Sequence, residues 1–179
     1  MKNGPVTIRT CLALITRPAP VGPGAEASPQ VLLGFKKTGF GAGRWVGLGG
    51  HIEEGEEPAE AAVREIAEES SLIVAVSALT PMASLNFIFP ARPSWNQTAE
   101  VFVATEFAGQ AAESDELIPR WFGIGSLPLD GMWDDARYWL PLVLAGQKVT
   151  ADITFADDCA TVAAIDPDPR TGPVGGHRT

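Results

Sequence analysis

Glutamates are concentrated between residues 53 and 69, and two of them have a spacing that could hold a metal ion. Glu65 and Glu69 stand at i and i+4, so on a helix they share one stripe, where like charges cost roughly 0.2–0.5 kcal/mol. A hard divalent cation such as Mg²⁺ prefers carboxylate oxygens and would relieve this repulsion. A solvated acidic face without a ligand is the alternative, and most charge runs form only that. Spacing alone leaves both interpretations open.

The segment that must position these carboxylates, residues 50–72, predicts turns that lead into a helix. Pro58 suits the first helical turn, because its missing N–H costs little there. Arg64 and Glu68 also stand at i and i+4, further round the helix. One face collects small and apolar side chains, which we expect to pack on the core: Ala59, Ala62, Val63, Ile66 and Ser70.

A glycine-rich stretch, residues 38–50, directly precedes the acidic segment. Its glycines lack the spacing of a dinucleotide-binding fingerprint, and the Gly-Lys-Ser/Thr of a P-loop is missing. For Gly49 and Gly50 we expect a close approach of the backbone to phosphate and metal, which residues without side chains allow. For the earlier glycines a flexible loop explains the pattern equally well.

Runs rich in β-branched and aromatic residues predict strands around this segment. The first two strands are expected to pair as a hairpin across a surface loop at residues 17–30. The expected strands are residues 6–16, 31–36, 72–76, 81–89, 98–107 and 117–122.

A second helix is expected to start at Met132, with Asp134 or Asp135 as its cap. Pro141 must then lie near the first turn or kink the helix. Two further β-rich runs predict a hairpin, and the Pro- and Gly-rich end of the chain predicts a disordered tail. These segments are residues 149–155, 159–165 and 166–179.

The acidic segment is similar to the Nudix box, GX₅EX₇REUXEEXGU, where U is an aliphatic residue. Ser71 replaces the last glycine, which accepts a left-handed conformation more cheaply, so a small loss of stability is expected. In this family the loop–helix–loop binds divalent metal and hydrolyses a nucleoside diphosphate linked to another group. The matched positions are Gly50, Glu56, Arg64, Glu65, Ile66, Glu68, Glu69 and Leu72.

Residues 31–165 also resemble the oxidised purine nucleoside triphosphatases of the MutT/Nudix group, which hydrolyse 8-oxo-dGTP and 2-hydroxy-dATP. The matching stretches are residues 39–45, 113–116, 132–135 and 138–139. The resemblance implies an α/β fold, the Nudix α/β/α sandwich with a central mixed β-sheet. It places one Nudix hydrolase domain at residues 1–165.

The resemblance also implies roles for individual residues. The Gly49 carbonyl, Glu65, Glu68 and Glu69 match metal ligands, and Glu116 matches a glutamate that joins the metal site or the proton transfer. Arg64 matches an arginine that orients the glutamates, and Lys36 a lysine that faces the substrate. The expected base pocket consists of Thr10, Phe40, Phe87, Met132, Trp133 and Asp135, with Trp133 stacked on the purine.

Two departures fall in that pocket. Val46 stands where the family has an asparagine, and Ala136 replaces the second of two aspartates, of which Asp135 is kept. Close carboxylates can share a proton, and in the family this pair is thought to select among oxidised bases. The departures therefore affect the expected base selectivity and leave the hydrolytic residues in place.

The implied reaction is a Mg²⁺-dependent hydrolysis, with Mn²⁺ as a possible substitute, that yields a nucleoside monophosphate and pyrophosphate. Metal ions would polarise phosphoryl oxygens and lower the pKa of bound water. Glu65, Glu68 and Glu116 are the candidates for the general base, and the sequence does not choose among them.

The composition argues against two classes of partner. The chain has 179 residues, 45% hydrophobic and 20% charged, which fits a single domain. Its net charge of −9 argues against a nucleic-acid polymer or an anionic membrane as partner. A phosphate substrate stays compatible, because a bound metal ion inverts the local charge.

The cysteines and histidines indicate the compartment and exclude one metal. Cys11 and Cys159 are expected to be buried free thiols in a reducing compartment, the cytoplasm. His51 and His177 are the only histidines, so a Cys/His zinc cluster is excluded. We expect neither a signal peptide nor a membrane-spanning stretch. The sequence does not indicate an oligomeric state.

Three other functions compete with this interpretation. A Nudix hydrolase of ADP-ribose, a dinucleoside polyphosphate or an unmodified nucleoside triphosphate is kept open by Val46 and Ala136. A non-catalytic nucleotide-binding Nudix module is less favoured, because such modules usually lose glutamates that this chain keeps. A structural acidic-helix protein would leave the glycine stretch unexplained.

Overall fold

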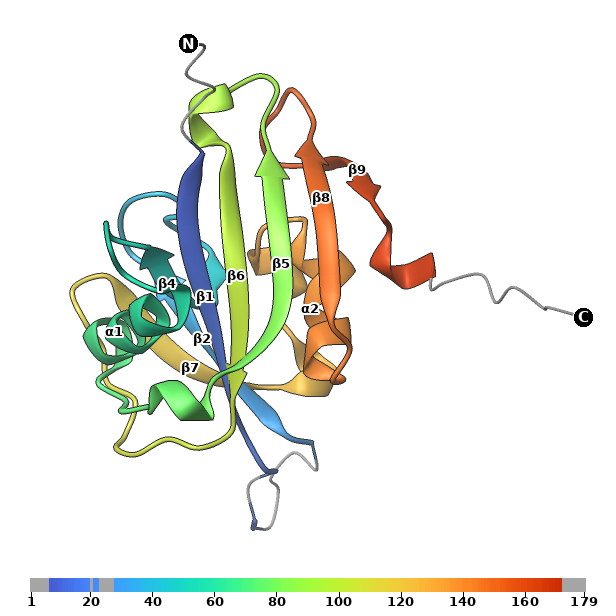
Figure 1. Cartoon of the computed structure of the whole chain (residues 1–179). Coiled ribbons are helices and arrows are strands. Elements are labelled where there is room, and N and C mark those ends of the chain that lie inside the picture. Colours follow the sequence, from blue (N-terminus) through green and yellow to red (C-terminus); the bar gives the residue numbers. More distant parts are fainter. Residues whose placement is uncertain (1–6, 20, 23–27, 172–179) are drawn as a thin grey trace, which may run out of the picture.

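The computed structural model describes residues 7–19, 21–22 and 28–171, which form one mixed β-sheet with an α-helix on each face (Figure 1). The strands are β1 (Ile8–Arg17), β2 (Gln30–Lys36), β3 (Trp45–Val46), β4 (Leu48–His51), β5 (Thr80–Ile88), β6 (Gln97–Ala104), β7 (Leu117–Gly123), β8 (Val149–Phe155) and β9 (Val162–Asp166). The α-helices are α1 (Pro58–Ser70) and α2 (Ala136–Leu144). Short 3₁₀ helices occupy Val76–Ala78, Pro93–Trp95, Ile124–Ser126, Leu129–Gly131 and Pro169–Thr171.

The sheet has the order β3-β2-β1-β6-β5-β8-β9, while β4 pairs with β1 and β7 pairs with β2. β1 runs parallel to β6 and β5 runs parallel to β8, whereas the other pairs are antiparallel. The hairpins β1–β2 and β8–β9 are both present, as expected. The α/β/α sandwich with a central mixed sheet is therefore confirmed.

Two hydrophobic clusters fill the space between the sheet and the helices, and β1 contributes to both. Cys11, Ala13 and Ile15 belong to the cluster with α1, whereas Leu14 belongs to the cluster with α2. Successive side chains of a strand point to opposite faces. Alternation along β1 therefore assigns each side chain to one helix or the other.

Helix α1 buries the face that its sequence predicts. At its start the Glu60 carboxylate accepts a 3.1 Å hydrogen bond from the Glu57 N–H. Ala62 and Ile66 are fully buried, while Ala59 and Val63 are partly buried. The same packing carries Glu69 inward, so that only 3% of this residue is exposed. Of Glu65 and Glu69, which share one stripe of the helix, Glu69 thus lies inside the protein.

The end of α1 has the strain expected from its sequence. Ser71, the C-terminal cap, has φ 63° and ψ 7°, a left-handed conformation that glycine adopts at lower cost. Ser71→Gly should therefore raise the free energy of unfolding by about 0.5–1 kcal/mol. Ala67→Gly, at an exposed position inside the helix, should lower it by about 1 kcal/mol. Urea denaturation of both variants measures these two opposite changes in the free energy of unfolding. If Ser71→Gly were less stable than wild type, the left-handed conformation at residue 71 would be contradicted.

Two expected boundaries are wrong. Residues 72–76 do not form a strand: Ile73 makes a single bridge to Ala108, although Leu72 and Val74 are buried. Alternating burial therefore occurs here without a strand ladder. Helix α2 begins at Ala136 rather than Met132, because the preceding residues form a 3₁₀ helix and a turn.

The expected cap of α2 is right in position but not in its bonding. Asp135 holds the cap position, but its side chain makes no capping bond and instead accepts a 2.8 Å hydrogen bond from Nε1 of Trp139. Asp134 accepts a 2.8 Å hydrogen bond from the Val162 N–H and so ties α2 to β9. Pro141 lies inside the helix rather than in its first turn.

The last hairpin is shorter than expected. Cys159 lies in the turn before β9 with φ 54° and is partly exposed, so its expected burial is wrong. Cys11 is buried as expected, burial raises the pKa of its thiol to about 11, and both thiols are free. The expected tail, 166–179, begins inside β9, and residues 172–179 lie outside the described residues, as does Val6.

The described part of the chain contains no helix long and apolar enough to cross a membrane.

Candidate active site

Lys36 lies between carboxylates from two segments that are far apart in the sequence. The register of β2 and β7 places Lys36 opposite Leu117, so that Glu116, directly before β7, comes beside it. The Lys36 Nζ lies 3.4 Å from Oε2 of Glu116 and 3.8 Å from Oε1 of Glu69. The sheet thus places the Lys36 ammonium group and the carboxylates of Glu69 and Glu116 together at the end of β2.

The loop before β7 is held by the next residue, Lys37. Its Nζ pairs with the Glu113 carboxylate and donates a 2.7 Å hydrogen bond to the Ser114 carbonyl. The Lys37 N–H also donates a 2.8 Å bond to the Glu116 carbonyl. These bonds fix the position of Glu116 relative to Lys36.

Glu69 is the buried carboxylate of this group. Its Oε2 accepts a 2.8 Å hydrogen bond from the Gly49 N–H. Burial raises the pKa of Glu69 to about 7, against the opposing effects of the Gly49 N–H and of Lys36. A carboxylate in this place is costly unless positive charge compensates it.

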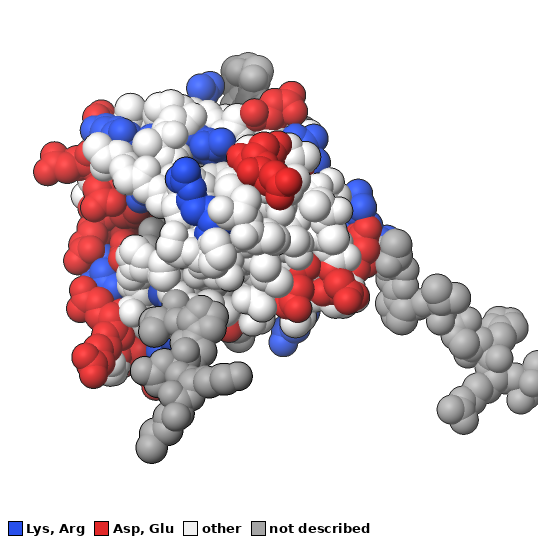
Figure 2. Space-filling model, turned by 90° about the horizontal axis from the view of Figure 1, so that it is seen from above, with Lys and Arg blue, Asp and Glu red and all other residues white. Residues whose placement is uncertain are grey.

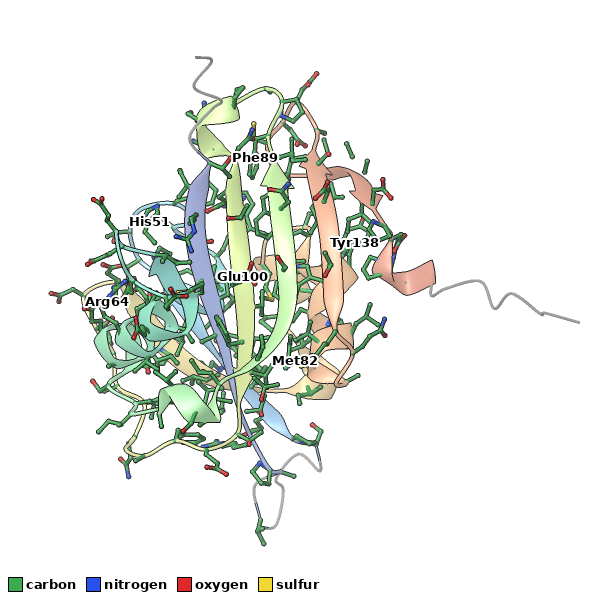
Figure 3. All side chains as sticks on the ribbon, in the orientation of Figure 1. His51, Arg64, Met82, Phe89, Glu100 and Tyr138 are labelled. Atoms are coloured by element: carbon green, nitrogen blue, oxygen red, sulfur yellow. The ribbon has the colours of Figure 1, made fainter. Side chains whose placement is uncertain are left out.

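Arg64 holds the other glutamates, as the resemblance implies. Its guanidinium donates to Glu56 over 2.9 and 3.0 Å and to Oε1 of Glu65 over 2.8 Å. It also lies 3.4 Å from Glu68 and donates a 3.0 Å bond to the His51 carbonyl. The hydrogen bond from Arg64 keeps the pKa of Glu56 below its usual value. Arg64 therefore orients these carboxylates and ties them to β4. Figure 3 shows Arg64 on the side of the molecule where α1 lies.

Gly49 and Gly50 permit a close approach of β4 to two neighbouring elements, to β1 at Gly49 and to α1 at Gly50. A Cβ on Gly49 would collide with the Cys11 carbonyl, and one on Gly50 would lie 2.5 Å from Oε1 of Glu65. Side chains are therefore excluded at both positions, by the Cys11 carbonyl and by the Glu65 carboxylate, while the expected approach to phosphate and metal stays a prediction.

The carboxylate group suits a hard divalent cation in composition. The described residues contain no group of three or more Asp, Glu, His or Cys side chains already arranged to hold a metal ion. Instead Glu65 pairs with Arg64, and Glu69 and Glu116 pair with Lys36. Oxygen donors and a buried carboxylate fit Mg²⁺ or Mn²⁺, so some of these pairs must open when several oxygens contact one ion.

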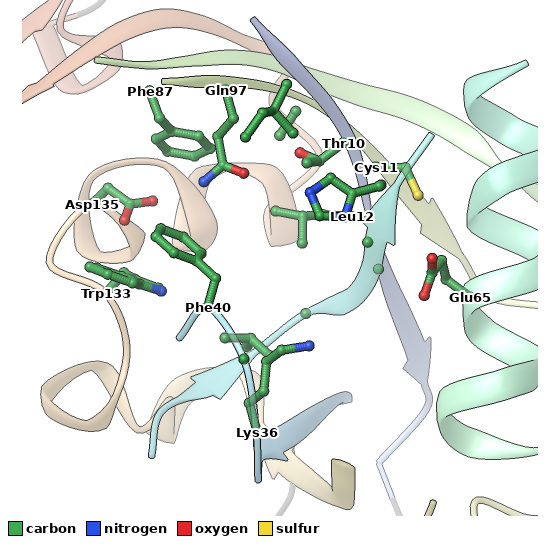
Figure 4. A pocket seen from close by; sticks show the side chains of 18 of the residues that line it. Thr10, Cys11, Leu12, Lys36, Phe40, Glu65, Phe87, Gln97, Trp133 and Asp135 are labelled. Atoms are coloured by element: carbon green, nitrogen blue, oxygen red, sulfur yellow. The ribbon is translucent and has the colours of Figure 1, made fainter. Parts of the chain in front are cut away.

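One cavity of about 750 Å³ joins these carboxylates to an aromatic end (Figure 4). Every residue of the expected site lines it except Glu69, which lies behind its wall. The expected residues along the cavity are Thr10, Lys36, Phe40, Val46, Gly49, Arg64, Glu65, Glu68, Phe87, Glu116, Met132, Trp133 and Asp135. The structure therefore brings the two halves of the expected site into one space.

At the aromatic end Trp133 contacts Phe89 and Phe155 in T-shaped geometry, and two further neighbours lie against its ring. The Phe40 ring stacks on it at 5.1 Å between ring centroids and an interplanar angle of 20°, and the Arg44 guanidinium lies 4.1 Å from its centroid. Both neighbours come from the glycine-rich stretch. A base that stacks on Trp133 must share or replace one of these contacts.

Asp135 lies in the cavity wall with 5% of its surface exposed, and burial raises the pKa of its carboxyl to about 6, against the effect of the Trp139 N–H. A pKa above the usual value means that the fold favours the protonated form. The resulting stability is present below about pH 4 and is lost as pH rises through about 6.

Asp135→Asn should therefore raise the free energy of unfolding by roughly 1–3 kcal/mol at pH 8, with the difference vanishing near pH 4. Urea denaturation between these pH values measures it, with the exposed Asp152→Asn as control. A difference that stays constant with pH would contradict the raised pKa.

Sequence reasoning missed several residues that line the cavity. Gln97 is the most informative, because it is polar and lies among aromatic rings. The available signal was the alternation of side chains along a strand. If the expected strand, 98–107, had begun one residue earlier, Gln97 would have shared a face with Ala99. The other missed residues include Phe89, Trp95, Trp139 and Phe155.

Charge is distributed unevenly over the surface. Figure 2 shows acidic side chains gathered along the side on which α1 lies in Figure 1. The side chains of Glu68 and Glu116 are 61% exposed, so the carboxylate end of the cavity opens on this acidic side.

Comparison with known proteins gives consistent results. The NUDIX domain model matches residues 25–143. The chain is 40% identical over 128 residues to the oxidized purine nucleoside triphosphate hydrolase of Mus musculus, covering 72% of this chain and 80% of that protein. It is 41% identical over 126 residues to the protein of the same name from Danio rerio, covering 70% and 79%.

Solved structures agree on the fold. A MutT protein from Bacillus halodurans superposes with a TM-score of 0.70 at 20% identity, covering 90% of this chain and 99% of that one. A MutT NUDIX hydrolase from Burkholderia pseudomallei gives a TM-score of 0.55 at 26% identity, covering 68% and 87%.

Proposed function

Because the chain belongs to the Nudix family and is a hydrolase, we propose that it hydrolyses oxidised purine nucleoside triphosphates to nucleoside monophosphates and pyrophosphate. The observation that carries this proposal is one continuous cavity, with carboxylates and Lys36 at one end and stacked aromatic rings at the other. A nucleotide has the same polarity, with phosphates at one end and a flat base at the other. The names of the relatives support the substrate class.

The residues proposed to hold Mg²⁺ are the Gly49 carbonyl, Glu65, Glu68, Glu69 and Glu116, with Mn²⁺ as a substitute. When bound, the metal would neutralise phosphate charge and lower the pKa of the attacking water. Lys36 lies beside these oxygens and would bind a phosphate after releasing a glutamate. Arg64 keeps the glutamates oriented through its bonds to Glu56 and Glu65.

The proposed reaction is attack of water on a phosphorus atom, with pyrophosphate as the leaving group. Glu65, Glu68 and Glu116 are the candidates to accept the proton of that water, because each lines the cavity. Trp133 and Phe40 would hold the base, which fixes the phosphates relative to the carboxylates. The Cys11 thiol, buried and free, suits a reducing compartment, and we place the protein in the cytoplasm.

The alternative is a Nudix hydrolase of another nucleoside diphosphate derivative. It is favoured by Val46, an apolar side chain in the cavity wall, and by Ala136, which is 3% exposed and offers no second carboxylate beside Asp135. Those two positions make the aromatic end less polar than the family pattern implies.

The test is Mg²⁺-dependent pyrophosphate release from 8-oxo-dGTP, 2-hydroxy-dATP, dGTP and dATP, with ADP-ribose followed as phosphate after phosphatase treatment. Preference for an oxidised purine supports the proposal. Preference for an ordinary nucleotide or ADP-ribose favours the alternative, and no turnover on any of them favours a nucleotide-binding module.

A further inference from the structure

Gln97 is held firmly at the aromatic end of the cavity. It is the first residue of β6 and lies between Ile8 of β1 and Phe87 of β5 in the sheet. The preceding Asn96 is fixed as well: its Oδ1 accepts a 2.7 Å bond from the Phe89 N–H, and its carbonyl accepts a 3.3 Å bond from the Ile8 N–H. The backbone from which Gln97 projects is therefore rigid.

The Gln97 side chain points into the cavity rather than to another part of the protein. Figure 4 shows its carboxamide directed into the space that Phe40, Phe87 and Asp135 border. Among the described residues no side chain or backbone group forms a hydrogen bond with this carboxamide, although the residue is partly buried. Its N–H₂ and its C=O are both available to a ligand.

The neighbouring polar side chains already form hydrogen bonds within the protein. The Thr10 hydroxyl donates a 2.8 Å bond to the Thr98 carbonyl, and Oδ2 of Asp135 accepts from Trp139. Val46 contributes no polar side-chain atom. Gln97 therefore offers an adjacent donor and acceptor on a backbone that the Asn96 bonds hold, which is the arrangement that pairs with two atoms of a base edge at once.

We infer that Gln97 is a specificity-determining residue that hydrogen-bonds the N7 edge of the purine, an inference that rests on the proposed function. In 8-oxoguanine N7 carries a hydrogen and lies beside carbonyl oxygens, so that the Gln97 Oε1 can accept from N7–H while Nε2 donates to an oxygen. Guanine presents only acceptors on this edge, and one of them would face the Gln97 Oε1.

Adenine offers the same carboxamide a donor, the 6-amino group, beside an acceptor, N7. Gln97 therefore separates oxidised from ordinary guanine and accepts adenine and 2-hydroxyadenine alike. With this assignment the cavity has a polar side chain that recognises the base, at position 97 and not at position 46, where the chain has valine.

The test is equilibrium binding of 8-oxo-dGMP, dGMP and dAMP, measured by calorimetry without turnover. Wild-type protein should bind 8-oxo-dGMP about 10-fold more tightly than dGMP, within the range expected for one bidentate pair. Gln97→Met, which has similar length but no hydrogen-bonding amide, should bring this ratio close to one by weakening 8-oxo-dGMP. Gln110→Met, in an exposed loop, should leave the ratio unchanged.

Gln97→Glu provides a second, independent variant. It keeps an acceptor for N7–H and should still favour 8-oxo-dGMP over dGMP, while 8-oxo-dGMP and dAMP both lose the bond that Nε2 donates and bind more weakly than to wild type. An unchanged ratio in Gln97→Met, or equal binding of both guanine nucleotides by wild type, overturns the inference. Because binding of monophosphates needs no hydrolysis, failure of the pyrophosphate assay would count against the proposed function and leave this result standing.

Discussion

Glu69→Gln should lower turnover by roughly 10²–10³-fold, the scale of losing one preorganised electrostatic contact, while the protein stays folded. The amide keeps the shape of the side chain and can still accept from the Gly49 N–H, but it removes the buried negative charge that faces Lys36. An uncharged group costs less to bury than a carboxylate. The melting temperature should therefore equal or exceed that of wild type, even as activity falls.

Steady-state kinetics and thermal denaturation of the same preparation test this pair of opposite effects. Glu54→Gln is the matched control, since Glu54 is an exposed residue of the loop before α1 that does not line the cavity. It should change neither quantity. Wild-type turnover in Glu69→Gln would show that the buried carboxylate does not serve the reaction.

Trp133→Ala should raise KM for purine triphosphates by about 10-fold or more, because base–aromatic stacking contributes roughly 1–3 kcal/mol per base. Removing the indole also leaves Phe40 and Arg44 without the ring that they contact. The effect should appear mainly in KM, since the carboxylates and Lys36 lie at the other end of the cavity.

Trp121→Ala is the control for this variant. Trp121 stacks with Phe107 and contacts Arg17, and it lies outside the cavity. Its loss should reduce stability and leave KM unchanged. If Trp133→Ala lowered kcat and left KM as in wild type, the ring would act on the chemistry and not on the base.

The sequence predicted α1 well because local rules and the required contacts agree there. Pro58 starts the helix, the small residues face the core, and the left-handed Ser71 ends it. Arg64 and the glutamates it holds all lie within a short stretch of chain, so their meeting depends little on the rest of the fold.

Features that depend on tertiary register were less predictable. Gln97 enters the cavity because β6 is placed between β1 and β5, which no local pattern specifies. The start of α2 lies later than expected because residues 129–131 form a 3₁₀ helix and a turn follows it. Residues 72–76 look like a strand because Leu72 and Val74 alternate into the core, yet only Ile73 has a bridge partner.

The pairing of β7 has a consequence for how copies of the protein behave at high concentration. β7 pairs with β2 over its whole length, and Pro119 lies opposite Gly34 inside that register. A proline has no N–H, and prolines in sheets are confined to places where the missing donor faces away from the ladder. The outward row of donors on β7 is therefore interrupted at Pro119. Such an edge is a poor template for a strand from a second chain, which protects the molecule from aggregating through this margin of the sheet.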